Sequence, residues 1–246
     1  MRIRRKSWTE PKLADCEYFV EDPRGMRGRW RERVAAPEHP LELEIGCGKG
    51  VSTAQMAREN PNTNYVAIDE VRHVLAVASK NADAAYAPDP VQNLVLTAVD
   101  AMFIRDSFAP ADKIARIHIS FPNPWTERIK QHKRRLTHPR QLMQYREFLT
   151  PGGEIHFKTD DAELFQASRE YLEFSGFTIT YETEDLHQSG YAPNYISEHE
   201  ALYAGRGIPI RFLIARMNDL PADFSWEFEG RRLDNIDRGG ADRRYI

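Results

Sequence analysis

The sequence has little cysteine, no long apolar run and almost no net charge, and each shortage excludes a class of protein. Two of the 246 residues are cysteine, Cys16 and Cys47, too few for a disulfide framework or a cysteine-based metal site. No run approaches the ~20 apolar residues of a membrane span, and no apolar signal segment follows the basic start. We therefore expect a cytoplasmic protein with no membrane anchor and no metal centre.

The net charge is small because many positive and negative charges cancel. The chain has 34 Lys and Arg against 37 Asp and Glu, a net charge of −3, which at first argues against a nucleic-acid partner. The first 34 residues nevertheless hold ten Lys or Arg and six acids, and residues 128–135 hold five Lys or Arg and no acid. Phosphate binding depends on the local field, although a basic run alone is more often a solvated face.

Short apolar runs alternate with longer mixed stretches from residue 40 onward, which predicts strands alternating with helices. The predicted strands cover residues 41–45, 65–68, 93–96, 114–119, 154–157, 177–181 and 210–214. The predicted helices cover residues 51–60, 71–87, 138–149 and 161–175. This alternation indicates an α/β fold with a doubly wound, Rossmann-like and mostly parallel sheet of seven strands.

The two ends of the chain lack this alternation. Residues 1–38 carry the basic excess without a clear period, and we expect a partly ordered basic arm there. Residues 218–246 include Pro221 and the pair Gly239-Gly240 and have a loop-like composition. The sequence therefore predicts one domain over residues 39–217, between an N-terminal arm and a C-terminal appendix.

A glycine turn, Glu44-Ile-Gly46-Cys-Gly48-Lys-Gly50, follows the first predicted strand. Its spacing differs from the G-x-G-x-x-G turn that seats a dinucleotide pyrophosphate, and Glu44 would repel such a group. Asp69, at the end of the second strand, suits the hydroxyls of a ribose, and Asp100 after the third suits an exocyclic amine. In succession these features favour S-adenosylmethionine as the cofactor, whereas the glycine turn alone could be purely structural.

Two prolines hold Asn123 in a rigid loop, Phe121-Pro-Asn-Pro-Trp125, after the fourth strand, and the basic stretch 128–135 follows at once. An amide, an aromatic ring and several cations are what a nucleotide in RNA would need, although a lone Trp is as often a core or lid residue. We expect Lys130, Lys133, Arg134 and Arg135 to contact the RNA backbone. Asp160 and Glu200, near later strands, could accept hydrogen bonds from the donor edge of guanine.

Together these motifs resemble those of the bacterial TrmB-type tRNA (guanine-N7-)-methyltransferases. The resemblance rests on the glycine turn, Asn60-Pro-Asn-Thr-Asn-Tyr65, Phe121-Pro-Asn-Pro-Trp125, Lys133-Arg-Arg135, His156-Phe-Lys-Thr-Asp160 and Ser197-Glu-His-Glu200, in order over residues 40–217. It implies a class I methyltransferase fold that transfers the methyl group of S-adenosylmethionine to N7 of guanine 46 in the tRNA variable loop.

The resemblance also implies roles for single residues. Glu44, Asp69, Asp100 and Asn123 fall on the family's cofactor-binding positions, beside Gly46 and Gly48 of the turn. Asp160, Ser197, Glu198, His199 and Glu200 fall on its substrate-binding positions. The resemblance leaves open which tRNAs are used and whether the chain is a monomer or a homodimer.

Three positions depart from the family pattern. The family usually has Asp where this chain has Asn123, a lysine shortly after the Trp where it has Thr126-Glu127, and Thr where it has Ser197. Lys130 is a candidate to replace the missing lysine.

Asn123 is the predicted catalytic residue, although guanine N7 has no proton to remove. Catalysis should come chiefly from alignment and electrostatic complementarity, so the loss of one negative charge would slow the reaction without abolishing it. Asn123→Asp is accordingly expected to preserve or raise activity.

Two other functions remain open from the sequence. A non-catalytic RNA-binding protein with a degenerate methyltransferase domain would explain Asn123 and Glu127, but the intact glycine turn argues against it. A methyltransferase for another acceptor is possible because the cofactor motifs do not identify the acceptor. A nicotinamide-dependent oxidoreductase is disfavoured by the glycine spacing.

Overall fold

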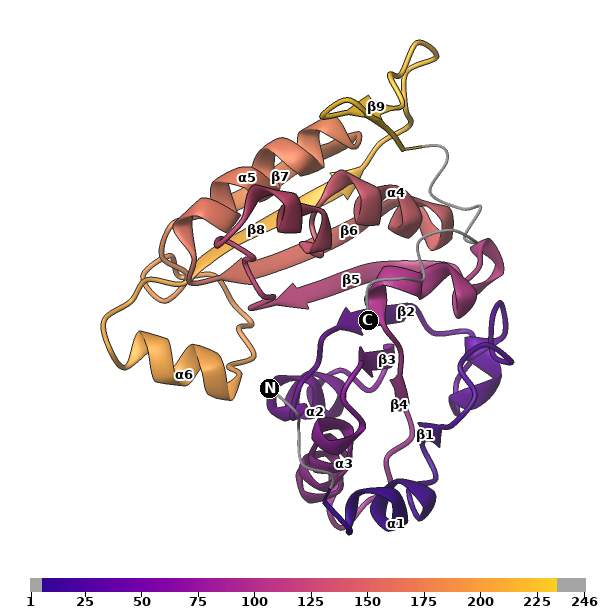
Figure 1. The fold of residues 1–246 in the computed structure, drawn as a ribbon. Coiled ribbons are helices and arrows are strands. Elements are labelled where there is room, and N and C mark those ends of the chain that lie inside the picture. The colour runs from indigo at the N-terminus through magenta and orange to yellow at the C-terminus, as the bar shows by residue number, and fades with distance from the viewer. Residues whose placement is uncertain (1–5, 234–246) are drawn as a thin grey trace.

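An open sheet of eight strands forms the centre of the computed structural model, which describes residues 6–233 (Figure 1). The strand order is β1-β4-β3-β2-β5-β6-β8-β7, and all neighbours are parallel except the two pairs that contain β8. The bounds are β1 (Phe19–Val20), β2 (Leu41–Ile45), β3 (Asn64–Asp69), β4 (Leu94–Ala98), β5 (Ile114–Ser120), β6 (Leu149–Thr159), β7 (Phe177–Thr183) and β8 (Arg211–Met217). The order reverses between β2 and β5, so their carboxyl ends form the switch point at which such folds bind ligands.

The predicted doubly wound, mostly parallel α/β sheet is confirmed, but the predicted number of seven strands is wrong by one. The eighth strand, β1, is a two-residue parallel edge strand in which Phe19 lies beside Leu96 and Val20 beside Thr97. The Thr97 hydroxyl donates a hydrogen bond of 2.8 Å to the Val20 carbonyl. Two residues are too few to show the alternation by which a strand is recognised in a sequence.

Helices lie on both faces of the sheet. Within residues 6–233 the α-helices are α1 (Thr9–Ala14), α2 (Val51–Glu59), α3 (Arg72–Tyr86), α4 (Pro139–Phe148), α5 (Ala162–Phe174) and α6 (Glu198–Ala204). The 3-10 helices are η1 (Trp30–Arg33), η2 (Ala101–Asp106), η3 (Pro110–Asp112) and η4 (Ile129–Arg134).

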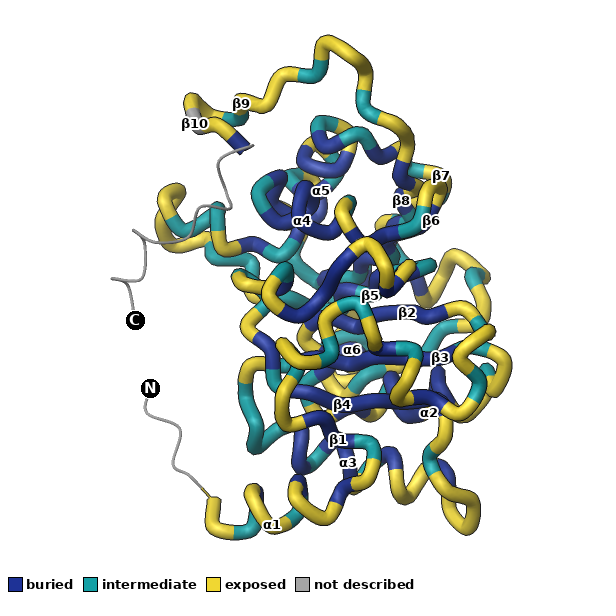
Figure 2. The backbone as a smooth tube through the Cα atoms, turned by 90° about the vertical axis from the view of Figure 1, so that its right-hand side faces the viewer, coloured by how far each residue is buried: buried dark blue, intermediate teal, exposed yellow. Residues whose placement is uncertain are grey.

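The side chains of β3 show which helices cover each face of the sheet. Tyr65 and Ala67 join an apolar cluster with α1, α2 and α3, whereas Val66 and Ile68 join the cluster that holds α4 and α5. Successive side chains of a strand point to opposite faces, so the two clusters lie on opposite sides of the sheet. Figure 2 shows the central strands as the buried part of the molecule and α6 as a largely exposed element.

The N-terminal region packs on the sheet domain through polar and aromatic contacts. Lys12 of α1 forms an ion pair of 2.6 Å with Asp83 of α3. Trp30 is fully buried, stacks on Phe108 and donates its indole N–H to the carbonyl of Ser107 at 2.8 Å. Residues 1–5 of the predicted arm lie outside the described residues.

Residues 218–233 contain a small hairpin, β9 (Glu227–Phe228) with β10 (Arg231–Arg232). Phe228 lies 4.8 Å from the Phe174 ring of α5, between ring centroids, and Phe224 lies 5.6 Å from the same ring. This part of the predicted appendix therefore packs against α5, and residues 234–246 lie outside the described residues. No helix within residues 6–233 is long and apolar enough to cross a membrane.

Candidate functional site

The glycine turn follows β2 at the switch point and begins α2. Gly46, Gly48 and Gly50 have φ angles of 79°, 55° and 67°, a region that favours glycine. A Cβ at Gly50 would lie 2.7 Å from the Cβ of Ala78, so this glycine lets α2 approach α3 closely. A Cβ at Gly46 or Gly48 would meet nothing within 4 Å. These two glycines therefore border open space, where a ligand can approach the backbone.

Asp69, at the end of β3, joins the glycine turn. Its carboxylate accepts a hydrogen bond of 3.0 Å from the Gly48 N–H and one of 2.8 Å from the Val71 N–H. Burial raises the pKa of Asp69, and these two backbone hydrogen bonds oppose the shift. Each oxygen accepts one of the bonds and keeps a further lone pair, so the carboxylate can still accept from two ligand hydroxyls.

Glu44 and Asp100 differ in exposure. Glu44 is 3% exposed and accepts a hydrogen bond from the Thr53 hydroxyl of α2. Burial raises the pKa of Glu44. Asp100 is exposed and accepts from the Met102 N–H at 2.8 Å, which caps η2. Glu44 is thus a buried residue that connects the turn to α2, whereas Asp100 is exposed after β4, the strand next to that of Asp69.

A pocket of about 210 Å³ opens at the glycine turn. It is lined by residues of three segments, namely Glu44 with residues 46–52, the β5 end at Ser120 and Phe121, and Ser197, Glu198 and His199 before and in α6. The pocket therefore brings the predicted cofactor residues Glu44, Gly46 and Gly48 together with three predicted substrate residues. The predicted cofactor residues Asp69, Asp100 and Asn123 do not line it.

The loop after β5 is held in a strained conformation around Asn123. Phe121 and Trp125 have positive φ angles of 52° and 50°, which are uncommon for residues other than glycine and concentrate at functional sites. Asn123 is exposed, and its side-chain oxygen accepts from the Trp125 N–H at 3.0 Å. Asn123 can therefore offer a ligand its NH₂ group and the second lone pair of this oxygen.

The basic stretch divides into exposed and buried members. Lys130 and Arg134 are exposed, and the Arg134 guanidinium lies 4.1 Å from the centroid of the Trp125 ring. Arg135 is 1% exposed, donates to the Pro124 carbonyl at 2.7 Å and pairs with Glu163 at 2.8 Å. The expectation that Arg135 contacts RNA phosphates is therefore corrected, because this side chain is buried and holds the Asn123 loop in place.

The segment before α6 also divides. The Ser197 hydroxyl accepts from the Glu200 N–H at 3.1 Å and caps α6. His199 is exposed, lies 3.1 Å from Asp160 and stacks on Tyr203 with 4.2 Å between ring centroids. Ser197, His199 and Asp160 thus lie around the pocket entrance.

Glu200 has a different place from the one predicted. It is fully buried and binds Lys158 at 3.1 Å, Asn194 at 2.7 Å and His187 at 3.0 Å. Burial lowers the pKa of Lys158, an effect that its pairing with Glu200 opposes. The prediction of direct guanine binding by Glu200 is corrected, because its carboxylate is taken up in attaching α6 to β6. Asn194 and His187 lie in a loop whose sequence carries no motif, so no sequence pattern indicated this cluster.

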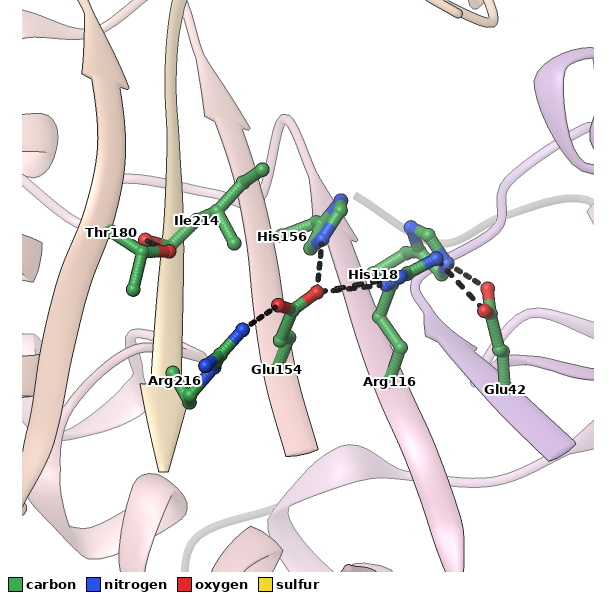
Figure 3. A network of polar contacts seen from close by, with 8 residues as sticks. All are labelled: Glu42, Arg116, His118, Glu154, His156, Thr180, Ile214 and Arg216. Carbon is green, nitrogen blue, oxygen red and sulfur yellow. Dashed lines mark hydrogen bonds and ion pairs between the residues drawn. The ribbon is translucent and has the colours of Figure 1, made fainter. Parts of the chain in front are cut away.

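A second pocket of about 330 Å³ adjoins the first and shares Glu44, Ser52 and Ser120 with it. Its floor includes His118, His156 and Arg116, which belong to a polar network across β2, β5 and β6 (Figure 3). Within residues 6–233 no three His, Cys, Asp or Glu side chains are arranged to hold a metal ion.

The chain is similar in sequence to known methyltransferases. Residues 38–210 match the model of a family described as putative methyltransferase. The tRNA (guanine-N(7)-)-methyltransferase of Clostridium perfringens strain SM101 is 47% identical over 88% of this chain and 99% of its own length. That of Clostridium botulinum strain Eklund 17B is 45% identical over 89% of this chain and 100% of its own.

The fold of the chain is similar to that of a solved structure. It is a mutant 16S rRNA (adenine(1408)-N(1))-methyltransferase from Catenulisporales acidiphilia with its cosubstrate, similar at a TM-score of 0.52 and 14% identity over 81% of this chain and 93% of that one.

Proposed function

This chain belongs to the tRNA (guanine-N(7)-)-methyltransferase family, and on that premise we propose that it transfers the methyl group of S-adenosylmethionine to N7 of a guanine in the tRNA variable loop. The observation that carries the proposal is the shared pocket. The glycine turn and the segment Ser197–His199 line one space at the switch point of the sheet. A cofactor on the turn and an acceptor base held by that segment would therefore meet.

The residues that line the pocket and the acids beside it fit S-adenosylmethionine. Open space beside Gly46 and Gly48 lets a ligand lie against the backbone, and the remaining lone pairs of Asp69 suit the two ribose hydroxyls. Asp100 stands one strand further, where its carboxylate can accept from the adenine amine. When bound, the cofactor supplies a methyl group on a positively charged sulfur.

The protein's part in the reaction is alignment. Guanine N7 attacks with its own lone pair, so no side chain has to act as a general base. Asp160, held beside His199, is a partly exposed carboxylate that can accept from the guanine N1–H and N2–H₂ donors. Asn123 lies in a loop that its flanking residues keep rigid, and it offers an NH₂ group to the cofactor or the base.

The tRNA backbone is bound by the exposed part of the basic stretch. Lys130, Lys133 and Arg134 are at least partly exposed on η4, next to the Asn123 loop. Cations there would neutralise phosphates of the nucleotides that flank the target base. Arg135 and Glu200 act indirectly, by holding the Asn123 loop and α6. The cytoplasmic location and the choice between monomer and homodimer stay predictions.

Transfer of a labelled methyl group to unmodified tRNA tests the proposal. We expect incorporation with the wild-type chain and loss of about 100-fold or more in Asp69→Ala, which removes both the turn contact and the ribose acceptors. Glu59→Gln, on the exposed end of α2, serves as the matched control. A non-catalytic RNA-binding protein would bind tRNA without incorporation, and a methyltransferase for another acceptor would bind the cofactor but leave tRNA unlabelled.

A substitution at Asn123 tests the catalytic assignment. Asn123→Asp keeps the oxygen that accepts from the Trp125 N–H and adds a negative charge near the cationic product. We expect the rate of methyl transfer to be preserved or raised by up to about tenfold. A large loss of kcat in this variant would show that the chain uses the amide itself.

A further inference from the structure

An ion pair spans the mouth of the cofactor pocket. Lys49, within the glycine turn, reaches Glu198, the first residue of α6, with 2.8 Å between Nζ and Oε2. Both residues line the pocket. Their side chains are 52% and 54% exposed, so the pair lies at the open side of the pocket and is in contact with solvent.

This pair is easily opened. Exposed ion pairs contribute little to stability, because water screens the charges and two long side chains must be ordered. The backbone on either side is held by other contacts. Asn81 donates to the Lys49 carbonyl at 2.8 Å, and the buried Glu200 attaches α6 to Lys158. The two charged groups can therefore separate without loss of the turn or of the helix.

The pocket offers few other charges for a ligand. Within the described residues, Lys49 is the one lysine or arginine that lines it. Of its two glutamates, Glu44 is buried and bonded to Thr53, which leaves Glu198 as the accessible carboxylate. A ligand with both a carboxylate and an ammonium group would find one partner for each.

We propose that Lys49 and Glu198 separate to bind the amino-acid end of S-adenosylmethionine, Lys49 holding its carboxylate and Glu198 its ammonium group. The inference rests on the proposed function, because it deepens the description of the same cofactor site. One exposed ion pair is replaced by two that are shielded by the ligand, and charge-assisted hydrogen bonds of this kind are among the stronger ones.

The arrangement also couples the cofactor to the acceptor. Glu198 lies between Ser197 and His199, which stand at the entrance where the guanine would bind. A cofactor bound to Glu198 would order the first turn of α6 before the tRNA binds. By linkage, tRNA that orders this turn should tighten cofactor binding through Glu198.

Calorimetric titration with ligands that lack one group tests the assignment of Lys49. Decarboxylated S-adenosylmethionine keeps the sulfonium and the ammonium group but has no carboxylate. Lys49→Met should weaken binding of the complete cofactor by about tenfold and binding of the decarboxylated one by less than about twofold. Lys113→Met, a lysine before β5 at the opposite edge of the sheet, should change neither. Equal weakening of both ligands by Lys49→Met would overturn the proposal.

The matching experiment for Glu198 uses S-adenosylhomocysteine and its deaminated analogue. Glu198→Gln should weaken the first by about fivefold to tenfold and leave the second unchanged within about twofold. Circular dichroism checks that each variant is folded. Equal effects of Glu198→Gln on the two ligands would remove Glu198 from the site. If the wild-type chain binds none of these ligands, the proposed function fails as a whole, which is distinct from the failure of this clamp alone.

Discussion

One row of side chains crosses the sheet and changes character halfway. On the side of β3 and β4 it consists of Leu94 and Tyr65, which pack under α2 and α3. From β2 onward the same row continues as Glu42, Arg116, Glu154 and Arg216, each beside the next on the neighbouring strand. The chain therefore satisfies the same sheet face in two ways, by burial under helices and by alternating charge.

The charged half is bonded from strand to strand. Arg116 lies 2.9 Å from Glu42 and 3.3 Å from Glu154, and Arg216 lies 3.5 Å from Glu154 (Figure 3). His118 lies 2.7 Å from Glu42, and His156 lies 3.1 Å from Glu154. The two ends of the row differ in exposure, since the side chain of Glu42 is 8% exposed and that of Arg216 56%, with Arg116 at 36% and Glu154 at 22% between them. Charge can replace a helical cover because every acid has a cation beside it.

Removal of the innermost charge should have the largest effect on stability. Glu42→Ala leaves Arg116 and His118 without their buried partner, and we expect a loss of about 4 kcal/mol in the free energy of unfolding. Denaturant unfolding of the variant measures it. Glu38→Ala, an exposed residue before β2, is the control and should stay within about 0.5 kcal/mol of wild type. A loss below 1 kcal/mol for Glu42→Ala would show that the row is only loosely coupled.

On the side of β3 and β4, where helices cover the sheet, truncation of an apolar side chain should lower the free energy of unfolding slightly less than Glu42→Ala does. Leu96 is 1% exposed and lies beside Ala67 under α3. Leu96→Ala should lower the free energy of unfolding by about 3 kcal/mol, the sum of lost burial and a cavity. Ligand binding should persist at low temperature. A fall in stability of less than 1 kcal/mol would mean that this half is not tightly packed.

The dependence of stability on pH should come from the charged half. Burial lowers the pKa of His156 from 6.5 to about 4. The hydrogen bond between Glu154 and His156 lowers the pKa of Glu154 from 4.5 to about 2. Both shifts have the same sign, because the unfolded chain binds protons at a higher pH than the folded chain. The His156 contribution is lost as pH falls from about 6.5 to 4, and that of Glu154 follows from about 4.5 to 2.

His156→Gln tests this directly. Between pH 7.5 and pH 5, the titration of His156 should lower the free energy of unfolding of the wild-type chain by about 2 kcal/mol. The variant lacks this group, so its free energy of unfolding should fall by about 2 kcal/mol less over the same range. Thermal unfolding at the two pH values measures the difference. The same slope in both proteins would place the titrating group elsewhere.

The outermost charge should have the smallest effect. Arg216 is more than half exposed and lies 3.5 Å from Glu154, which also has Arg116 and His156. Arg216→Ala is expected to change the free energy of unfolding by less than about 1 kcal/mol. Denaturant unfolding in low and in high salt checks this, because an exposed pair should weaken further in salt. An effect as large as that of Glu42→Ala would contradict the difference in exposure between the two ends of the row.

The sequence predicted the frame of the fold well because that frame depends on local patterns. The apolar runs of β2, β3 and β5 and the periodic stretches of α3 and α5 lie within a few residues of their predicted bounds. The glycine turn was equally readable, since positive φ angles require glycine. The short strand β1 has no local pattern and depends on its neighbour β4.

Burial of single charges could not be predicted in this way. Lys133, Arg134 and Arg135 are adjacent and similar in type, yet Arg135 is buried because Pro124 and Glu163 provide its partners. Glu200 has the same residue type as Glu198, two positions before it, but one faces Lys158 and the other Lys49. Such differences arise from tertiary contacts, which a motif does not encode.

The proposed function depends on which atom receives the methyl group. The most direct test is digestion of tRNA to nucleosides after incubation of unmodified tRNA with the protein and labelled S-adenosylmethionine. We predict label in 7-methylguanosine, from the guanine of the variable loop, and its loss when that guanine is replaced. Label in another nucleoside, or none although the cofactor binds, would contradict it.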